Sequence, residues 1–224
     1  MGRERFAALM AGDPATLALD ETALLISTTL QPGLDVIEWL AALDLLAGEC
    51  PTPTPEGVAR HLFDTEHFTG NRRAYYDWRN SCLDRVIATR TGIPITLALV
   101  MIEVARRLGV RLVGVGMPAH FLVRVADDTD VFYDPFDQGK RLDRAGARAV
   151  FEDVTRGQVP WKDSYLEPTL NRDIIIRILN NLKSVFVGRS DVVRLGLVMG
   201  LRDEVEELSE LEDAEIAIAT AIFN

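Results

Sequence analysis

Residues 96–108 constrain the fold of this chain most, because they are apolar nearly all round. A helix on a protein surface keeps one polar face, whereas a helix that is hydrophobic on every side is buried. Gly92-Ile93-Pro94 stops the preceding helix and starts this one, and Gly109 is suited to end it. The segment therefore predicts a central, buried helix that other elements cover.

Three short segments rich in β-branched and aromatic residues follow, at 111–117, 121–125 and 131–133. Such segments, bounded by polar turns, are typical of β-strands. The acidic residues 127–130 form the turn between the second segment and the third. We expect the strands to pair as an antiparallel meander. Together with the central helix they predict an α+β fold.

Helical patterns flank this region on both sides. Apolar residues at mixed three- and four-residue spacing predict amphipathic helices over 16–30 and 33–46, with Pro32-Gly33 between them. The same patterns recur in the C-terminal part of the chain. Further helices are expected over 142–155, from 170 onward, over 192–199 and 204–211, and in the tail 214–223.

Two helix starts can be predicted from capping residues. Thr54 is suited to be an N-cap, with Pro55 in the first turn. Asn80 or Ser81 is suited to cap a helix that runs to Thr89. Both predictions place a short helix shortly before the central one.

The charge and the apolar runs of the chain limit its partners. The net charge of the 224 residues is −10, which argues against nucleic-acid binding, because that binding depends on Lys and Arg neutralising phosphates. The longest apolar run, 93–105, is too short for a bilayer, which needs ~20 apolar residues. The N-terminus has no apolar signal core. We expect a cytoplasmic protein without nucleic-acid or membrane partners, and its oligomeric state stays open.

The cysteines and histidines match no metal or disulfide pattern. Cys50 and Cys82 lie 32 positions apart, and two cysteines make no disulfide framework in a chain of this size. His61 and His67 are six apart, so a helix would not bring them to one face. The acidic turn at 127–130 lacks the Gly and the terminal Glu of a calcium loop. We expect reduced thiols, no metal and no cofactor.

Several short motifs occur together between about residue 60 and about residue 185. Each motif is weak alone, but the combination is specific. The motifs are Phe68-Thr69-Gly70-Asn71, Tyr76-Asp77, Asn80-Ser81, Arg90-Thr91-Gly92-Ile93-Pro94-Ile95-Thr96-Leu97, residues 103–109, Pro118-Ala119-His120-Phe121-Leu122-Val123-Arg124, Asp134-Pro135-Phe136, Asn171-Arg172 and residues 179–183. With them the chain resembles the SirB-type transglutaminase-like family, bacterial proteins that often carry a tetratricopeptide-like tail.

The resemblance implies a papain-like core, in which a central helix packs on a small antiparallel sheet. Helical segments flank this core at both ends. On this basis we expect an N-terminal helical segment at 1–55, a transglutaminase-like core at 56–168, and a C-terminal helical segment at 169–224 that resembles a truncated tetratricopeptide-like module.

The resemblance also implies a site. In active relatives a Cys at the start of the central helix is held as a thiolate by an imidazolium, and an Asp orients the ring. His120 and Asp134 resemble the His and Asp of the family. The alternative is that His120 forms a structural hydrogen bond at a strand start and that Asp134 shapes the turn before Pro135. We favour a site, because both residues occur together in the right order.

The nucleophile is missing from its usual place. At the start of the central helix, neither Pro94 nor Ile95 can attack a substrate. Thr96 has a hydroxyl, but in a first helical turn such a group more often bonds the backbone. Cys82 is another candidate, because a thiol in the first turn of a helix has a lowered pKa. Free Cys is more often buried and inert, and we favour that role for Cys82.

The first of two hypotheses is a protein-binding or regulatory domain without catalysis. A groove beside His120 would hold a peptide segment of a protein partner, and the aromatic residues before the central helix would line it. The missing Cys favours this hypothesis. The expected binding residues are Tyr75, Tyr76, Trp78, Asn80 and Arg124.

The second hypothesis is a cysteine-dependent hydrolase or acyltransferase of the peptidase type. It would use Cys82, His120 and Asp134, with Thr96 as a weaker nucleophile. This chemistry requires the Cys82 sulfur within about 3–4 Å of the imidazole. A single distance therefore separates the two hypotheses.

Overall fold

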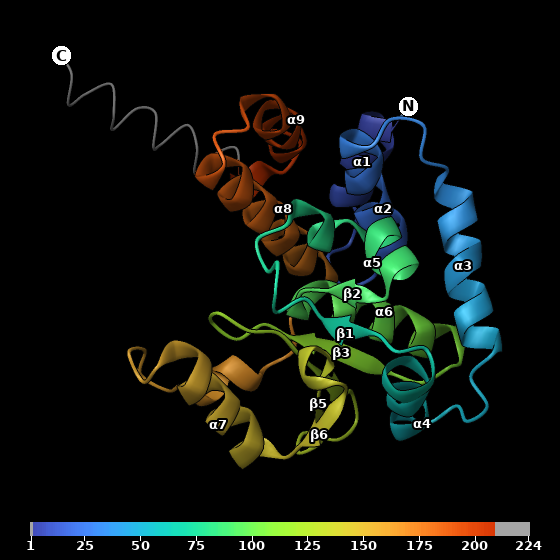
Figure 1. The fold of residues 1–224 in the computed structure, drawn as a ribbon, viewed down its shortest axis with the longest axis vertical. Coiled ribbons are helices and arrows are strands. Elements are labelled where there is room, and N and C mark those ends of the chain that lie inside the picture. Colours follow the sequence, from blue (N-terminus) through green and yellow to red (C-terminus); the bar gives the residue numbers. More distant parts are fainter. Residues whose placement is uncertain (1, 209–224) are drawn as a thin grey trace.

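The structure, a computed structural model, describes residues 2–208. Helices dominate it, and a small antiparallel sheet lies among them, which confirms the predicted α+β class (Figure 1). The helices are α1 (Gly2–Met10), α2 (Leu19–Leu30), α3 (Val36–Gly48), α4 (Pro55–Arg60), α5 (Leu83–Thr89), α6 (Pro94–Arg107), α7 (Arg144–Thr155), α8 (Asn171–Gly188) and α9 (Val192–Arg202).

The main sheet is an antiparallel meander in which neighbouring strands follow one another along the chain. This confirms the predicted pairing, and Val123 faces Tyr133 across the two middle strands. The last strand is an addition that the sequence does not indicate, because Lys140 and Arg141 are exposed and leave no apolar pattern. The strands are β3 (Leu112–Val115), β4 (Leu122–Val125), β5 (Phe132–Asp134) and β6 (Lys140–Leu142).

A second, two-stranded pair joins the loop before α5 to the start of α6. β1 (Thr69–Gly70) and β2 (Thr91–Gly92) run parallel. At Gly70 a Cβ would lie 2.5 Å from the Phe136 ring, so only glycine lets this ring approach the backbone. The pair therefore fixes the chain around the start of α6.

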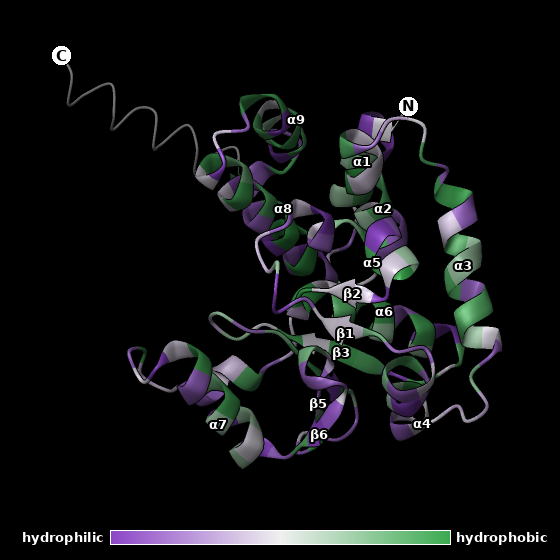
Figure 2. Cartoon of the chain, viewed as in Figure 1, coloured by the Kyte–Doolittle hydropathy of each residue, from purple (hydrophilic) through white to green (hydrophobic). Residues whose placement is uncertain are grey.

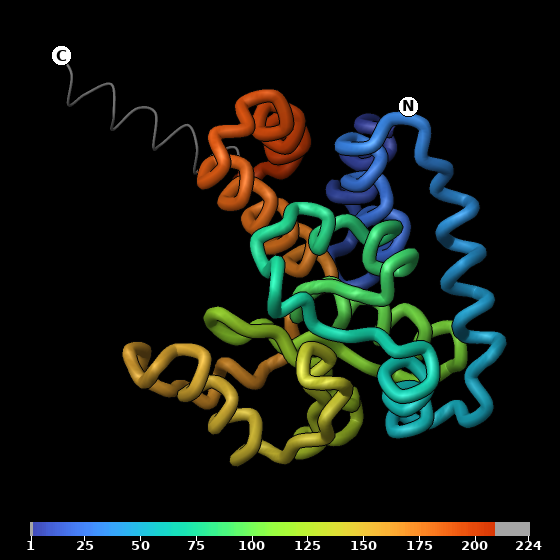
Figure 3. The backbone as a smooth tube through the Cα atoms, viewed as in Figure 1, coloured from blue at the N-terminus to red at the C-terminus, as the bar shows by residue number. Residues whose placement is uncertain are grey.

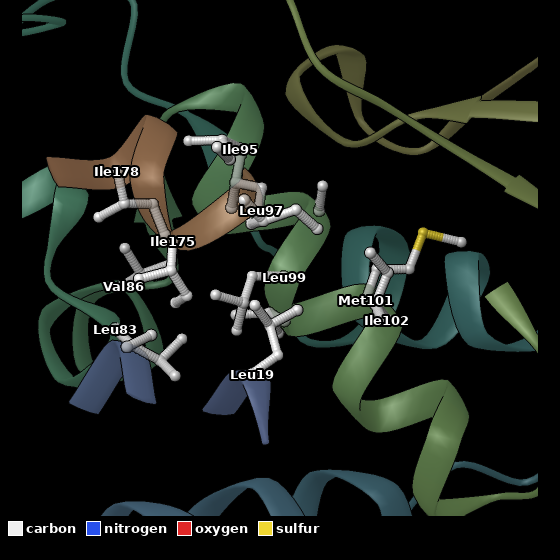
Figure 4. Packing of buried hydrophobic residues seen from close by; sticks show 14 of the residues in the cluster. Leu19, Leu83, Val86, Ile95, Leu97, Leu99, Met101, Ile102, Ile175 and Ile178 are labelled. Carbon is white, nitrogen blue, oxygen red and sulfur yellow. The ribbon is translucent and has the colours of Figure 1, made fainter. Parts of the chain in front are cut away.

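Helix α6 is the centre of the fold, as predicted. All its residues from Pro94 to Ala105 are buried. Figure 4 shows its side chains among those of Leu83 and Val86 from α5, Leu19 from α2, and Ile175 and Ile178 from α8. Because every side of the helix meets apolar side chains, its uniformly apolar sequence is explained.

The two faces of the sheet are covered by different elements. Val123 and Tyr133 belong to the large core around α6, whereas Leu122 and Phe132 belong to a smaller cluster with Phe151 of α7. Successive residues of a strand point to opposite faces, so this alternation follows from the strand geometry. In Figure 1, α7 lies apart from the N-terminal helices for this reason.

The helix starts differ in part from expectation. Thr54 does cap α4, because its Oγ1 accepts a hydrogen bond from Gly57 N at 3.1 Å. The predicted cap of α5 by Asn80 or Ser81 is wrong. These residues belong to a 3-10 turn, Trp78–Ser81, and Cys82 is the N-cap of α5. The reason is that the Asn80 amide group donates to Ala74 O and Tyr75 O instead.

The terminal helices share the core of the central helix. One continuous hydrophobic cluster extends from Phe6 of α1 to Leu208. Helices α1 and α2 contact α9 directly, and the blue N-terminal helices lie next to the red helix α9 in Figure 3. In Figure 2, hydrophobic and hydrophilic residues alternate along α3 and α8, as amphipathic helices require. The boundaries at 55 and 168 stay predictions.

The C-terminal expectations can be followed only in part. Helices α8 and α9 pack against each other. Part of the helix expected over 204–211, and all of the tail helix over 214–223, lie outside the described residues. Between residues 2 and 208, none of the helices has the length and apolar character that crossing a bilayer requires.

Candidate functional site

His120 and Asp134 form a hydrogen-bonded pair. His120 lies just before β4 and Asp134 ends β5, so the antiparallel pairing of these strands brings the two together. The distance from His120 Nε2 to Asp134 Oδ2 is 2.9 Å. The two side chains are buried, with exposed fractions of 6% for His120 and 5% for Asp134. Since a carboxylate only accepts, Nε2 is assigned as the donor. The structure thus brings together the two residues predicted as a pair.

The carboxylate of Asp134 is anchored by the backbone behind it. Its Oδ1 accepts hydrogen bonds from Phe136 N at 3.0 Å and Asp137 N at 3.3 Å. Asp134 is thereby the N-cap of a 3-10 turn, Pro135–Asp137. With one oxygen bound to this turn and the other to the imidazole, the orientation of the His120 ring is fixed.

The turn before His120 is held by helix α8. Arg177 Nη2 donates to Met117 O at 2.8 Å and to His120 O at 2.9 Å. Ala119 has a φ of 62°, in the left-handed region that residues other than glycine rarely adopt. Such strain persists only where the surroundings impose it, and Arg177 supplies this constraint.

A cleft of about 1080 Å³ opens beside the pair. His120 and Asp134 line it together with the aromatic rings of Tyr75, Tyr76 and Phe136. The ring of Tyr75 packs edge-on against Phe136, with 5.8 Å between centroids, and against Tyr76 at 5.3 Å. Residues of α7 also line the cleft. The cleft is large enough for a ligand of several residues.

The start of α6 faces the same cleft without a nucleophile. Pro94, the first residue of the helix, lines the cleft. Thr96 is buried, and its Oγ1 donates to Asn80 O at 2.7 Å and accepts from Ile93 N at 3.2 Å. Its hydroxyl is therefore engaged in structural hydrogen bonds with the backbone.

Cys82 lies elsewhere. Its side chain is fully buried, and its Sγ is 3.8 Å from Trp78 O. Burial, followed by the nearby Asp84 carboxylate, raises the pKa of the thiol. Among the described residues, no hydrogen bond joins Cys82 to His120. The contact that the thiol-enzyme hypothesis requires is therefore missing from this structure.

The expected binding residues divide into two groups. Tyr75 and Tyr76 line the cleft, and Tyr76 is 73% exposed. Trp78 does not line it. Its ring packs against Phe186 of α8 at 6.2 Å and beneath the guanidinium of Arg194 of α9 at 5.0 Å. The expectation that Trp78 lies beside His120 is wrong, because the 3-10 turn directs it to the C-terminal helices.

Asn80 and Arg124 also lie away from the cleft. Asn80 is buried and holds the preceding loop through Ala74 O, at 2.7 Å. Arg124 lies on the face of the sheet opposite α6, and its Nη1 donates to Leu166 O at 3.3 Å. Its Nε is buried without a hydrogen-bond partner among the described residues. Both residues support the fold and not the cleft surface.

Two polar residues near His120 are not apparent from the motifs. Arg177 and Asn181 lie one turn apart on α8 and approach the pair from the C-terminal part of the chain. The sequence signal for Arg177 is its position inside the apolar run from Ile174 to Leu179. A charged side chain is rarely buried among apolar residues unless it has a partner or a function.

The described residues offer no group of three His, Cys, Asp or Glu side chains that could hold a metal ion. His61, one of the histidines considered above, is buried and contacts Leu46 O through Nε2 at 2.9 Å.

Comparison with known proteins agrees with this architecture. Residues 31–180 match the transglutaminase-like superfamily. A UPF0162 protein of Xylella fastidiosa is 40% identical over 188 residues, which cover 78% of this chain and 66% of that protein. A UPF0162 protein of Vibrio cholerae is 28% identical over 59% of this chain and 49% of its own length.

A third relative is of a different kind. F-box only protein 21 of Mus musculus is 39% identical over 90 residues, which are 36% of this chain and 14% of that protein. The chain thus spans just under two thirds of the length of the Xylella relatives, at 66%. No solved structure matches it. The match over residues 31–180 covers more than half of the chain, which therefore belongs to the transglutaminase-like superfamily.

Proposed function

We propose that this chain is a binding module built on a transglutaminase-like site, and that it holds a peptide segment of a protein partner in the cleft beside His120. One observation carries the proposal. The hydrogen-bonded pair of His120 and Asp134 opens onto the cleft, while Pro94 occupies the helix start on the same cleft. The pair is complete, but it has no thiol to activate.

The chemistry of the pair supports binding over covalent catalysis. A His–Asp pair promotes acyl transfer by taking a proton from a nucleophile placed beside it. Pro94 has no such proton, and the Thr96 hydroxyl already bonds the backbone. The imidazole can still form hydrogen bonds with a ligand. No contact favours the alternative, a thiol hydrolase that uses Cys82.

The shape and composition of the cleft support a peptide as the ligand. Ligand sites in proteins are concave and combine aromatic walls with a few polar groups. Tyr75, Tyr76 and Phe136 provide aromatic surface in the cleft, and His120 provides a polar group. Aromatic rings provide large contact areas with few rotatable bonds, which suits peptide recognition.

A finer assignment is also part of the proposal. Within the superfamily we assign the chain to the SirB type, with a papain-like core at 56–168 and a tetratricopeptide-like helical segment that begins with α8 and α9. The motifs from Phe68 to Lys183 support this assignment. We further propose a cytoplasmic location, which the two free cysteines, Cys50 and Cys82, support.

The test is peptide capture. A synthetic pool of decapeptides of degenerate sequence, with free C-terminal carboxylates, is passed over the immobilised protein, and retained peptides are identified by mass spectrometry. Dissociation constants of retained peptides are then measured by fluorescence anisotropy. We expect Tyr76→Ala to weaken binding about fivefold or more, as loss of an aromatic anchor does.

The matched control is Ile37→Ala, which also removes an exposed hydrophobic side chain but lies on α3, away from the cleft. It should leave binding unchanged. The proposal fails if no peptide is retained, or if binding survives both Tyr76→Ala and His120→Ala. Cleavage or acyl transfer of a retained peptide that is lost in His120→Ala would overturn the non-catalytic part.

A further inference from the structure

A small cavity of about 90 Å³ adjoins the cleft. The cavity and the cleft share four lining residues, Tyr75, Pro94, Ala119 and His120. The cavity extends from there toward α8. A volume of this size holds a few non-hydrogen atoms, since water occupies ≈ 30 Å³ per molecule in the liquid. It can therefore take the end of a ligand whose main part lies in the cleft.

Arg177 brings a positive charge to this cavity, and its guanidinium lies over the ring of Phe121, 5.5 Å from the ring centroid. The residue is half-buried, and its Nη2 donates hydrogen bonds to Met117 O and His120 O. Its Nε and Nη1 have no acceptor, and no carboxylate pairs with it, among residues 2–208. Burial lowers its pKa, as expected for a guanidinium that is partly removed from water. A desolvated cation without an anion favours an anionic ligand.

Three further groups in the cavity are free to donate hydrogen bonds. The Asn181 amide and the Tyr75 hydroxyl line the cavity and have no partner in the described part of the chain. At the start of α6, the backbone N–H of Ile95 also lacks an acceptor there, since the first bond of the helix is from Leu97 N to Ile93 O. These donors strengthen the preference for an anion.

His120 adds one acceptor beside these donors. Its Nε2–H is directed to Asp134, so in a neutral ring the lone pair is on Nδ1. Nδ1 forms no hydrogen bond to a described residue, although His120 as a whole is only 5% exposed and lines the cavity. A ligand that suits the site therefore carries an anion and, next to it, a single N–H.

The end of a peptide chain has this combination of groups. We propose that the cavity binds the C-terminal carboxylate of the peptide in the cleft, with Arg177 and Asn181 donating to the carboxylate and the last peptide N–H donating to His120 Nδ1. The inference rests on the proposed peptide binding and names which part of the peptide is recognised. It makes His120 a hydrogen-bond acceptor for the ligand.

The direct test uses two small probes, N-acetylglycine and N-acetylglycinamide, at equal ionic strength. Both carry the amide N–H, but only the first has a carboxylate. Binding is followed by NMR, from the amide signals of Ile95 and Phe121 and the Nε–H signal of Arg177. We expect saturable shifts with N-acetylglycine and none with N-acetylglycinamide.

Two isosteric variants on α8 separate a local charge effect from a general one. Asn181→Asp places a carboxylate inside the cavity beside Arg177, and should weaken N-acetylglycine binding about tenfold or more by like-charge repulsion. Asn180→Asp makes the same charge change on the exposed side of the helix, where Asn180 Oδ1 accepts from Arg202. Its effect should stay within about twofold, because exposed charges are screened.

The outcomes separate this inference from the proposed function. If N-acetylglycinamide binds as well as the acid, or Asn181→Asp has no effect, the carboxylate site is overturned, even when decapeptides still bind through Tyr76. If decapeptides do not bind but N-acetylglycine does, with the expected response to Asn181→Asp, the proposed peptide binding fails and the carboxylate site stands. The decapeptides with amidated ends should bind about tenfold more weakly than the acids if both hold.

Discussion

The two ends of α6 are built in opposite ways. At the C-terminal end, Arg107 contacts three carboxylates, Asp20 at 2.6 Å, Asp44 at 2.6 Å and Glu103 at 2.8 Å. Arg106 adds contacts to Glu103 and Asp20. At the N-terminal end, polar groups of His120, Arg177 and Asn181 have no partner for one or more of their atoms in the described chain.

This difference indicates which end of α6 can bind a ligand and which cannot. Charges that are already paired gain little from a ligand, because the ligand would have to replace their partners. Polar groups that surround a cavity without partners gain hydrogen bonds when a ligand enters. One end of the helix therefore contributes to stability, and the other is available for recognition.

The largest loss of stability is expected from Arg107→Met, which breaks the charge cluster at the C-terminal end of α6. The guanidinium is only 12% exposed, and its loss leaves the buried carboxylates of Asp20 and Glu103 close together. We expect the free energy of unfolding to fall by about 3 kcal/mol, the lower end for a broken buried pair, since Arg106 still contacts both. Urea denaturation measures this change.

Arg111→Met is the matched control for that variant. Arg111 pairs with Asp127 on the surface, where the side chains are 73% and 67% exposed. Exposed pairs contribute ~0–1 kcal/mol. Equal losses in the two variants would show that the charge cluster at the end of α6 has no special role.

The second effect concerns pH. Burial, and then the neighbouring Asp20 carboxylate, raise the pKa of Glu103 to about 6, whereas an unfolded Glu titrates near ~4.3. The folded state binds this proton more tightly, so its contribution is present in full below about pH 4.3 and is lost as the pH rises through about 6. The size of the loss is about 2 kcal/mol.

Glu103→Gln removes this titration and should flatten the unfolding free energy between about pH 4.5 and pH 6 relative to wild type. The titration of Asp20 does not overlap with this pH range. Burial alone would raise its pKa, but the Arg107 guanidinium outweighs burial and lowers it, so Asp20 titrates at more acidic pH. Identical pH profiles for the two proteins would contradict the assignment.

The smallest effect on stability, below about 1 kcal/mol, is expected from Pro94→Cys, because the first position of a helix tolerates many residues. The introduced thiol should lie at the helix start near His120 and have a pKa below the free value of ~8.5. Iodoacetamide labelling against pH, read by peptide mass spectrometry, measures it. Buried Cys82 provides the internal comparison, because it should be labelled only after unfolding.

The role of His120 is isolated by adding His120→Ala to Pro94→Cys. The introduced thiol should then titrate closer to a free Cys. Labelling that is equally slow at pH 6.5 with and without His120 would mean that the helix start and the imidazole do not cooperate.

Much of the fold could be predicted from the sequence. Helix α6 is identifiable because every side of it is apolar, and the strands because their residues are β-branched and lie between polar turns. The pair β1–β2 could not be predicted, since each strand has two residues and the pairing joins Thr69 to Thr91 across a long loop. Such short strands leave no periodic signal.

The site was predictable only where sequence order and strand order coincide. His120 and Asp134 lie on consecutive strands, so their proximity follows from the meander. Trp78 is only two residues from Tyr76, yet a 3-10 turn separates their environments. Arg177 and Asn181 reach the cavity from a helix far along the chain, and only the packing of α8 on the core brings them there.

The continuous core has a consequence for how the domain can be inherited. The superfamily match begins at residue 31, after α2, and ends at residue 180, inside α8. Yet Phe6, Leu24 and Val198, outside that stretch, are fully buried in the core shared with α6. The stretch that matches the superfamily is thus smaller than the stretch that shares this hydrophobic core. Residues 31–180 alone would leave apolar side chains of α6 exposed to water unless other elements covered them.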